Sequence, residues 1–239
     1  MGKWKQRLEK VNWKEEAKKR VAKEAAKHVE DGFVIGLGSG STAAYVINEI
    51  GLMKKQDRLK VLGVPSSSQA MMLAVKSGIP LTTLDEHPNL DLTIDGADEI
   101  DNKLDMIKGG GGALTKEKIV ASAAKQVIIV ADETKLVEKL GTTFRLPIEV
   151  LPFALTTVMN RIRELGGKPS LREGKNKVGA VVTDNGNYIL DVEFGPIEKA
   201  AELNRKLKFI PGLIETGLFL NIADLIYIGK KEGIVKLKK

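Results

Sequence analysis

Residues 33–50 read FVIGLGSGSTAAYVINEI, an aliphatic run that passes through a glycine-rich turn into a helix-forming segment. A short run without polar alternation is typical of a strand that is buried on both faces of a parallel sheet. A helix that begins directly after glycines places its first N–H groups at the carboxyl end of that strand. The stretch therefore predicts one strand–turn–helix unit of an α/β fold.

The same alternation continues on both sides of this unit. Residues 14–30 predict an amphipathic helix that ends at Asp31 and Gly32, with an apolar side made of Ala17, Val21, Ala22, Ala25, Ala26 and Val29. Further strands are predicted at 60–64, 81–84, 92–95 and 127–131, and further helices at 67–76 and 115–125. Strands that alternate with helices predict an open, Rossmann-like parallel sheet with helices on both faces.

The rhythm changes after about residue 147. Strands are predicted at 148–151, 168–171, 180–183, 188–193 and 212–217, and helices at 153–165 and 196–207. The turn Asp184-Asn185-Gly186 between two alternating runs indicates a hairpin. This order resembles a split βαβ sandwich, so we expect a smaller ferredoxin-like α+β domain at 147–220, available for oligomerisation. Residues 1–146 with 221–239 then form a Rossmann-like catalytic domain, to which a hairpin at 225–228 and 234–237 returns.

Composition excludes several classes of protein. With 43% hydrophobic and 29% charged residues, the 239-residue chain is expected to be globular rather than disordered. It contains no apolar run of membrane-spanning length and no secretory signal in its first 30 residues, so we expect a cytoplasmic protein. The absence of cysteine excludes disulfides, thiolate catalysis and cysteine metal sites.

The net charge of +7 comes largely from one segment. Residues 1–30 hold ten Lys and Arg against five Glu, which leaves the rest of the chain close to neutral. A basic amphipathic helix of this kind is typical of a solvated surface, since nucleic-acid binders spread their charge or interleave aromatic residues. We therefore expect neither a nucleic-acid partner nor a membrane partner.

The glycine-rich turn GLGSGST, residues 36–42, is the first candidate site. A dinucleotide fingerprint would need glycine at Ser41 and an acidic residue after the strand at 60–64, and a P-loop would need Gly-Lys-Ser/Thr. What remains is a small-anion cradle at a helix start, with hydroxyls from Ser41 and Thr42, that fits one phosphate monoester. The alternative is a merely tight turn.

The acidic stretch DGADE, residues 95–99, is the second candidate, because it follows a strand whose carboxyl end faces the ligand crevice of an α/β sheet. Asp95 and Asp98 can converge there for acid–base work or for binding sugar hydroxyls. One alternative is a solvated acidic loop. The other is a cation site built from Asp95, Asp98, Glu99 and Asp101.

Lys108 and the four glycines that follow it form the third candidate, directly before a helix with Glu117 in its first turn. Four ordered glycines cost backbone entropy, which suggests close contact with a ligand. Glu117 also has a plain explanation, since the helix dipole favours acidic residues near a helix start. Lys18 lies in an apolar arc and needs a partner or an aqueous cleft, and Lys135 follows another strand end. His28 and His87 are isolated and are interpreted as structural.

Together these segments resemble the A-type ribose-5-phosphate isomerases. The matching stretches, in family order, are GSGST 38–42, VPSSS 64–68, DGADEI 95–100, MIKGGG 106–111, EKI 117–119, ADETK 131–135 and VTDNGN 182–187. The resemblance implies an enzyme without metal or other cofactor that interconverts D-ribose 5-phosphate and D-ribulose 5-phosphate in the non-oxidative pentose phosphate pathway. It also implies a homodimer or homotetramer. The stretch at 172–177 looks longer than in the family and says little about catalysis.

The resemblance also implies roles for single residues. Glu117 takes the position of the catalytic base, and Asp95, Asp98 and Lys108 are the other catalytic candidates. The implied substrate-binding residues are Lys18, Ser39, Gly40, Ser41, Thr42, Asp95, Gly96, Ala97, Asp98, Lys108, Gly109, Gly110, Gly111 and Lys135.

The chemistry suits these residue types independently. One carboxylate can carry a proton between two neighbouring carbons through a cis-enediolate, while an ammonium or N–H groups stabilise the oxyanion. The rival enzyme reading is another sugar-phosphate or acyl-CoA enzyme on a similar scaffold. The rival outside catalysis is a sugar-phosphate-sensing regulatory module, which would need a DNA-binding helix pair where residues 1–32 predict a single helix.

Overall fold

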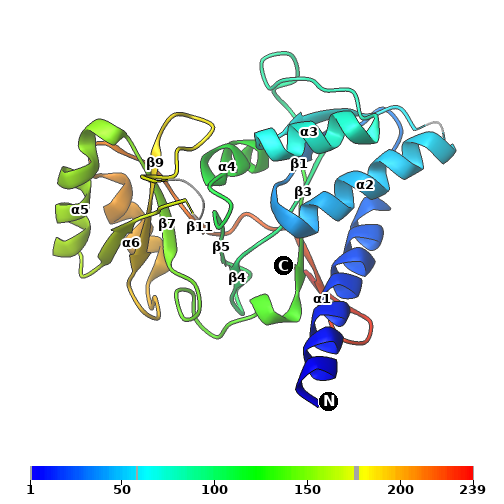
Figure 1. The fold of residues 1–239 in the computed structure, drawn as a ribbon. Coiled ribbons are helices and arrows are strands. Elements are labelled where there is room, and N and C mark those ends of the chain that lie inside the picture. Colours follow the sequence, from blue (N-terminus) through cyan, green and yellow to red (C-terminus); the bar gives the residue numbers. More distant parts are fainter. Residues whose placement is uncertain (1, 58, 175–177, 239) are drawn as a thin grey trace. The chain divides into compact units, whose positions relative to one another are not determined.

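The computed structural model describes residues 2–57, 59–174 and 178–238, and it describes only the backbone of residues 2–12 and 57. The chain forms two compact units (Figure 1). Unit 1 consists of Met1–Gly96, Ile119–Lys135 and Ala223–Lys239, and unit 2 consists of Ala97–Lys118 and Leu136–Ile222. These units place residues 97–118, 136–146 and 221–222 with the second unit, whereas the sequence assigns them to the first domain. The two units are defined by compactness, whereas the sequence predicts domains that fold separately. The predicted boundaries at 146–147 and 220–221 therefore stay a prediction.

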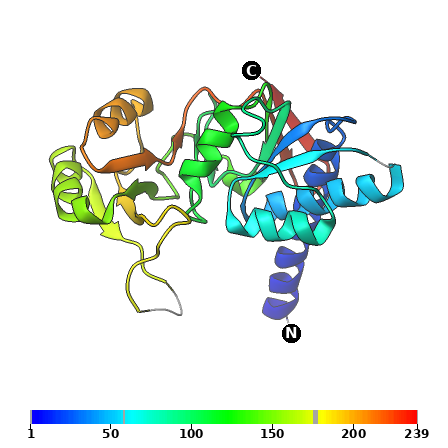
Figure 2. The ribbon, with the colours of Figure 1, turned by 90° about the horizontal axis from the view of Figure 1, so that it is seen from above.

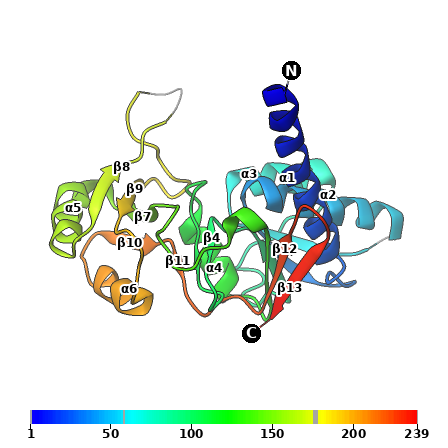
Figure 3. The ribbon, with the colours of Figure 1, turned by 90° about the horizontal axis from the view of Figure 1, so that it is seen from below.

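Unit 1 is built on a six-stranded sheet in the order β13-β12-β6-β3-β1-β2. Its strands are β1 (Val34–Leu37), β2 (Leu62–Pro65), β3 (Leu92–Asp95), β6 (Val127–Asp132), β12 (Leu225–Gly229) and β13 (Ile234–Lys238). All neighbours pair in parallel except β12 and β13, which form an antiparallel hairpin at the edge (Figure 3). The predicted parallel sheet is confirmed, and so is the return of the C-terminal hairpin, because β12 pairs with β6.

Helices cover both faces of this sheet. Helices α1 (Gly2–Ala26), α2 (Gly40–Asp57) and α3 (Ser68–Ser77) share one apolar core with Ile35 and Leu37 of β1. Successive side chains of a strand point to opposite faces, so Gly36 faces the other way, toward the end of α4 (Leu114–Ser122). A Cβ atom at Gly36 would lie 2.4 Å from Val120 Cγ1, so only glycine lets this helix approach the strand.

Helix α1 and the turn after it bury the apolar side that the sequence predicts, since none of the six residues predicted to form it, from Ala17 to Val29, is more than 4% exposed. The helix begins well before residue 14 and ends at Ala26, and two turns carry the chain to Gly32, which has a φ of +84°. No helix in the part of the chain that the structure describes combines the length and low polarity required to cross a bilayer.

Unit 2 contains an antiparallel sheet in the order β10-β7-β9-β8, as the sequence indicates (Figure 2). Its strands are β7 (Leu146–Val150), β8 (Lys168–Leu171), β9 (Tyr188–Glu193) and β10 (Leu213–Thr216), and its helices are η2 (Pro152–Ala154), α5 (Leu155–Glu164) and α6 (Ala200–Lys208). Leu146, Ile148 and Val150 pack into one core with residues of α5 and α6. The alternate residues Pro147 and Glu149 face the opposite way, toward residues 109–115.

Unit 2 contains a second sheet that the sequence does not predict. It joins β4 (Glu99–Ile100), β5 (Met106–Ile107) and β11 (Leu218–Phe219) in the order β11-β5-β4. Each strand has two residues, which is too short for an alternating pattern to show in the sequence. The sheet matters because Lys108 follows β5 directly.

Two predicted strands are wrong. Residues 81–84 contribute a single bridge from Leu81 to Gly63 before the chain turns at 84–86, and the Thr82 hydroxyl hydrogen bonds to the side chains of Glu86 and His87. Residues 180–183 also form only isolated bridges, and the Thr183 hydroxyl donates to Glu149, a buried carboxylate of β7. The intervening turn is present, with Gly186 at a φ of +79°.

Candidate active site

The turn after β1 supplies the first group of candidate residues, all in unit 1. A Cβ atom at Gly38 would lie 2.3 Å from Asp95 Oδ1, so the backbone must pass this carboxylate as glycine. Gly40 starts α2 with a φ of +91° and donates its N–H to Gln69 Oε1 at 2.9 Å. Ser41 is exposed and Thr42 is half-buried in the first turn of the helix. The turn is tight, and its position at a helix start suits an anion.

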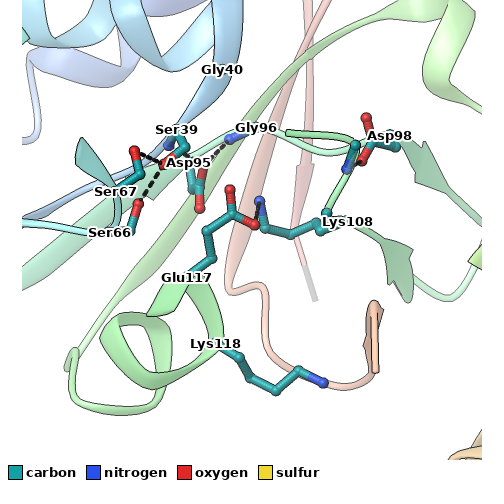
Figure 4. A network of polar contacts seen from close by, with 12 residues as sticks. Ser39, Gly40, Ser66, Ser67, Asp95, Gly96, Asp98, Lys108, Glu117 and Lys118 are labelled. Carbon is teal, nitrogen blue, oxygen red and sulfur yellow. Dashed lines mark hydrogen bonds and ion pairs between the residues drawn. The ribbon is translucent and has the colours of Figure 1, made fainter. Parts of the chain in front are cut away.

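Ser39 brings in two residues to which sequence reasoning gave no role. Its hydroxyl lies 2.8 Å from Ser66 Oγ and donates to Ser67 Oγ at 2.7 Å (Figure 4). Ser67 also caps α3 by accepting the Ala70 N–H. The stretch at 64–68 was part of the family resemblance, and the structure places its hydroxyls beside the glycine turn.

Asp95 ends β3 and is 5% exposed. Its Oδ1 accepts the N–H groups of Ser39 at 3.0 Å and of Gly96 at 2.7 Å (Figure 4). Two N–H donors to one oxygen fix the orientation of the carboxylate. Asp95 is therefore a held group within unit 1, and the prediction that it lies in a solvated loop does not apply to it.

Lys18 finds the partner that its position on α1 demands. Its ammonium pairs with Glu15 at 2.8 Å and donates to Ser41 Oγ at 3.1 Å, and its side chain is 16% exposed. Hydrogen bonds from Lys18 and Tyr45 lower the pKa of the Glu15 carboxyl below its usual value. The structure thus brings Lys18 to the start of α2. Lys135 lies half-buried at the end of η1 (Glu133–Lys135), also in unit 1.

Lys108 and Glu117 form a buried ion pair in unit 2 (Figure 4). Nζ of Lys108 lies 3.2 Å from Oε2 of Glu117, and the two side chains are 4% and 6% exposed. Lys108 is delivered by β5 and donates its N–H to Gly217 O, while Glu117 comes from the first turn of α4. An acidic residue that only serves the helix dipole needs no buried cation, so this geometry favours a functional role for Glu117.

Phe219 lies beside this pair and was not anticipated from the sequence. The ammonium of Lys108 lies 5.3 Å from the centre of its ring, and that of Lys118 lies 4.8 Å away. Lys118 points away from Glu117 (Figure 4) and pairs with Glu215 at 2.9 Å. Burial lowers the pKa of the Lys118 ammonium, and Glu215 opposes that shift. The ring, which is 1% exposed, thus helps to fix where both cations lie.

The glycines after Lys108 are held by Asp98. Asp98 Oδ2 accepts the N–H of Gly110 at 2.7 Å, and a Cβ atom at Gly110 would lie 2.7 Å from Asp98 Oδ1. Gly109 has a φ of +105°, which strongly favours glycine. Gly111 is exposed, and Ala97 is half-buried at the start of unit 2.

The cation site considered for the acidic stretch is not assembled. Glu99 is fully buried and accepts hydrogen bonds from the backbone of Gly141, Thr143 and Phe144 and from the Thr143 hydroxyl. Asp101 accepts the N–H groups of Lys103 and Asp105, and burial raises its pKa. Among the described residues, no three His, Cys, Asp or Glu side chains are grouped as metal ligands.

The buried carboxylate of Glu149 is the binding partner of the polar side chains at 182–187. Glu149 of β7 is fully buried and accepts hydrogen bonds from Thr183 at 2.9 Å, Asn185 at 3.0 Å and Asn187 at 2.8 Å. It also accepts the Thr115 hydroxyl from the first turn of α4. The motif therefore ties the hairpin turn to the helix that carries Glu117.

Comparison with known proteins settles the family. A sequence model of ribose 5-phosphate isomerase A (phosphoriboisomerase A) matches residues 62–233. The chain belongs to this family. The ribose-5-phosphate isomerase A of Thermosynechococcus vestitus is 52% identical over 214 residues, which cover 89% of this chain and 91% of that protein.

Solved structures agree. Ribose 5-phosphate isomerase A from Methanocaldococcus jannaschii superposes with a TM-score of 0.91 at 48% identity, covering 94% of this chain and 99% of that one. A D-ribose-5-phosphate isomerase in complex with phospho-erythronic acid gives a TM-score of 0.92 at 45% identity, with the same coverage. The chain is thus an aldose–ketose isomerase of a sugar phosphate, and the regulatory module is not supported.

Proposed function

We propose that the enzyme interconverts D-ribose 5-phosphate and D-ribulose 5-phosphate through a cis-enediolate, with Glu117 as the general base. The observation that carries this proposal is the buried Lys108–Glu117 pair, which places a carboxylate beside an ammonium where water has little access. Glu117 removes the proton at C2 of the aldose and returns it to C1, while the proton of the O2 hydroxyl moves to O1, and the reverse reaction uses the same steps in the opposite order. Electrons move from the broken C–H bond into the enediolate, so the reaction needs no external oxidant.

Lys108 stabilises the oxyanion that develops during proton transfer, together with N–H groups of the glycine loop other than those of Gly110 and Gly112, which bond to Asp98 and to Gly109 O. Lys108 is already fixed by Glu117 and by the Phe219 ring, so it needs little reorganisation as the charge develops. Asp98 is occupied by the Gly110 N–H, which favours a positioning role in the glycine loop. Asp95 is the better candidate for the hydroxyl proton that moves when the furanose ring opens.

The turn at Ser39, Gly40, Ser41 and Thr42 binds the phosphate in this proposal, with Lys18 and Lys135 supplying positive charge. The contact between Lys18 and Ser41 supports this role, since it brings an ammonium to the start of α2. The relative solved with phospho-erythronic acid supports a phosphorylated ligand. Because the phosphate does not react, its binding energy positions the sugar for the proton transfer.

We further propose that the enzyme is a cytoplasmic homodimer or homotetramer. In unit 2, Phe153 is 97% exposed and Phe209 is 80% exposed. Their segments are neighbours, because Leu151 donates its N–H to Gly212 O at 2.9 Å. Large exposed aromatic side chains on adjoining segments are typical of a surface that contacts another protein. The molar mass measured by light scattering tests whether the enzyme is a dimer or a tetramer.

The function is tested by adding ribose 5-phosphate to purified enzyme before and after exhaustive treatment with EDTA. We expect ribulose 5-phosphate to form at the same rate in both samples, because the proposed mechanism uses a carboxylate, an ammonium and N–H groups only. The measurement is ketose formation over time. An inactive enzyme would refute the proposed reaction, and activity that is lost with EDTA and restored by one divalent ion would refute the metal-free mechanism.

Loss of a phosphate contact should depend on the substrate. Each charge-assisted contact to a bound phosphate is worth roughly 1.5–3 kcal/mol. We therefore expect Thr42→Val or Lys135→Ala to lower kcat/KM for ribose 5-phosphate by about ten- to a hundredfold. The slow reaction of free ribose should hardly change, and inorganic phosphate should inhibit the variants less than the wild type. Equal losses with both sugars would place the phosphate elsewhere.

A further inference from the structure

The loop at residues 109–112 combines a high cost of ordering with a proposed role that needs order. Four consecutive glycines have more backbone conformations to lose than any other sequence of this length. One internal hydrogen bond, from Gly112 N–H to Gly109 O at 2.9 Å, closes the turn. This bond engages the Gly109 carbonyl once, and it leaves that oxygen's second lone pair and the Gly110 carbonyl to be fixed by other parts of unit 2.

Arg172 supplies that second attachment. It directly follows β8, and its Nη1 donates to Gly109 O at 2.9 Å and to Gly110 O at 3.1 Å. Its Nε donates to Asp191 Oδ2 at 2.8 Å, and Nη2 bonds to the other oxygen of the same carboxylate. The two side chains are 15% and 23% exposed. The planar guanidinium therefore joins strand β9 to two consecutive carbonyls of the glycine loop.

A second charged side chain, that of Asp98, also binds the loop. Gly110 donates its N–H to Asp98 while its carbonyl accepts from Arg172, so both polar groups of one residue are fixed by charged side chains. The same face of β9 also contacts the end of the loop. Ile189 lies on the face that carries Asp191, and its Cγ1 lies 4.0 Å from a Cβ atom built at Gly112.

We propose that Arg172, oriented by Asp191, is a positioning residue that orders the glycine loop for catalysis. This inference rests on the proposed function, in which the loop N–H groups stabilise the oxyanion. A looser loop must be ordered again in each transition state, so the loss falls on kcat more than on KM. Of the stretch at 172–177, which by sequence says little about catalysis, Arg172 thus receives a role. Residues 175–177 lie outside the described residues.

The test compares Arg172→Gln with Lys168→Gln. Lys168 is the first residue of β8, the strand that directly precedes Arg172, and it pairs with Glu193 of β9 rather than with the glycine loop, so it serves as the control. We expect Arg172→Gln to lower kcat by about tenfold with KM within about twofold, and to speed amide hydrogen exchange in a peptide that covers residues 107–113. Lys168→Gln should change neither quantity. Arg172→Lys should not restore kcat, because an ammonium cannot hold Asp191 and two carbonyls in one plane.

Asp191→Asn serves as a second variant if Arg172→Gln does not fold. It should give a smaller loss in kcat and faster exchange in the same peptide. Unchanged exchange at 107–113 in both variants would overturn the claim that Arg172 orders the loop. Faster exchange with unchanged kcat would overturn its role in catalysis. Wild-type enzyme without isomerase activity would instead refute the proposed function, and the exchange measurement would still test the structural claim.

Discussion

Glu117→Gln should lower kcat by at least about a hundredfold while KM for ribose 5-phosphate changes little. General bases contribute about 10²–10⁴-fold to a rate, and glutamine keeps the shape of the side chain but cannot take up the proton. Wild-type enzyme in deuterium oxide should place deuterium on C1 or C2 of the sugar, and the variant should not. Rates come from ketose formation, and deuterium incorporation comes from NMR of the recovered sugar.

A matched control separates loss of the base from loss of a buried charge. Glu215 pairs with Lys118 much as Glu117 pairs with Lys108, and its side chain is 17% exposed. Glu215→Gln should lower the melting temperature yet keep kcat within a few fold, because Glu215 has no role in the proposed proton transfer. If Glu117→Gln retains a rate close to wild type, Glu117 is an ordinary residue at a helix start, and the proposed mechanism is wrong.

Much of the fold is predictable because strong aliphatic runs mark it. The predicted strands at 92–95 and 188–193 have the same bounds as β3 and β9, and the predicted strand at 168–171, which reads KPSL, has the bounds of β8 without such a run. The runs at 81–84 and 180–183 form only isolated bridges, because turns at 84–86 and 184–186 compete with continued strand pairing. Local competition of this kind leaves no mark in a hydropathy pattern.

The candidate site is predictable in its residue types and less so in its contacts. Glu117 and Lys108 stand out next to a helix start and a glycine run, yet their pairing depends on β5 lying beside β11. Phe219 and Arg172 reach the same region of unit 2 from segments distant in the sequence, and neither belongs to a recognisable motif. Tertiary pairing decided these contacts, so a single sequence could not reveal them.

The charge on Lys108 is expected to matter as much as the carboxylate beside it. Lys108→Met keeps an unbranched side chain of similar length but leaves Glu117 buried without its cation. A buried carboxylate without a compensating charge takes up a proton more readily, and a protonated Glu117 cannot act as a base. Loss of a preorganised oxyanion partner alone costs about 10²–10³ in kcat. We therefore expect kcat near neutral pH to fall by at least about a hundredfold.

The pH dependence of Lys108→Met distinguishes its two causes. As pH rises, Glu117 loses the extra proton, so part of the lost activity should return, and the acid limb of the pH–rate profile should shift to higher pH. The control is Lys118→Met, which removes the other ammonium beside the Phe219 ring and should keep both kcat and the profile. The double variant Lys108→Met with Glu117→Gln should recover stability, since no buried charge is left unpaired, but not activity. An unshifted profile with a higher KM alone would assign Lys108 to ground-state binding, and the buried pair would then owe its place in unit 2 to stability rather than to proton transfer.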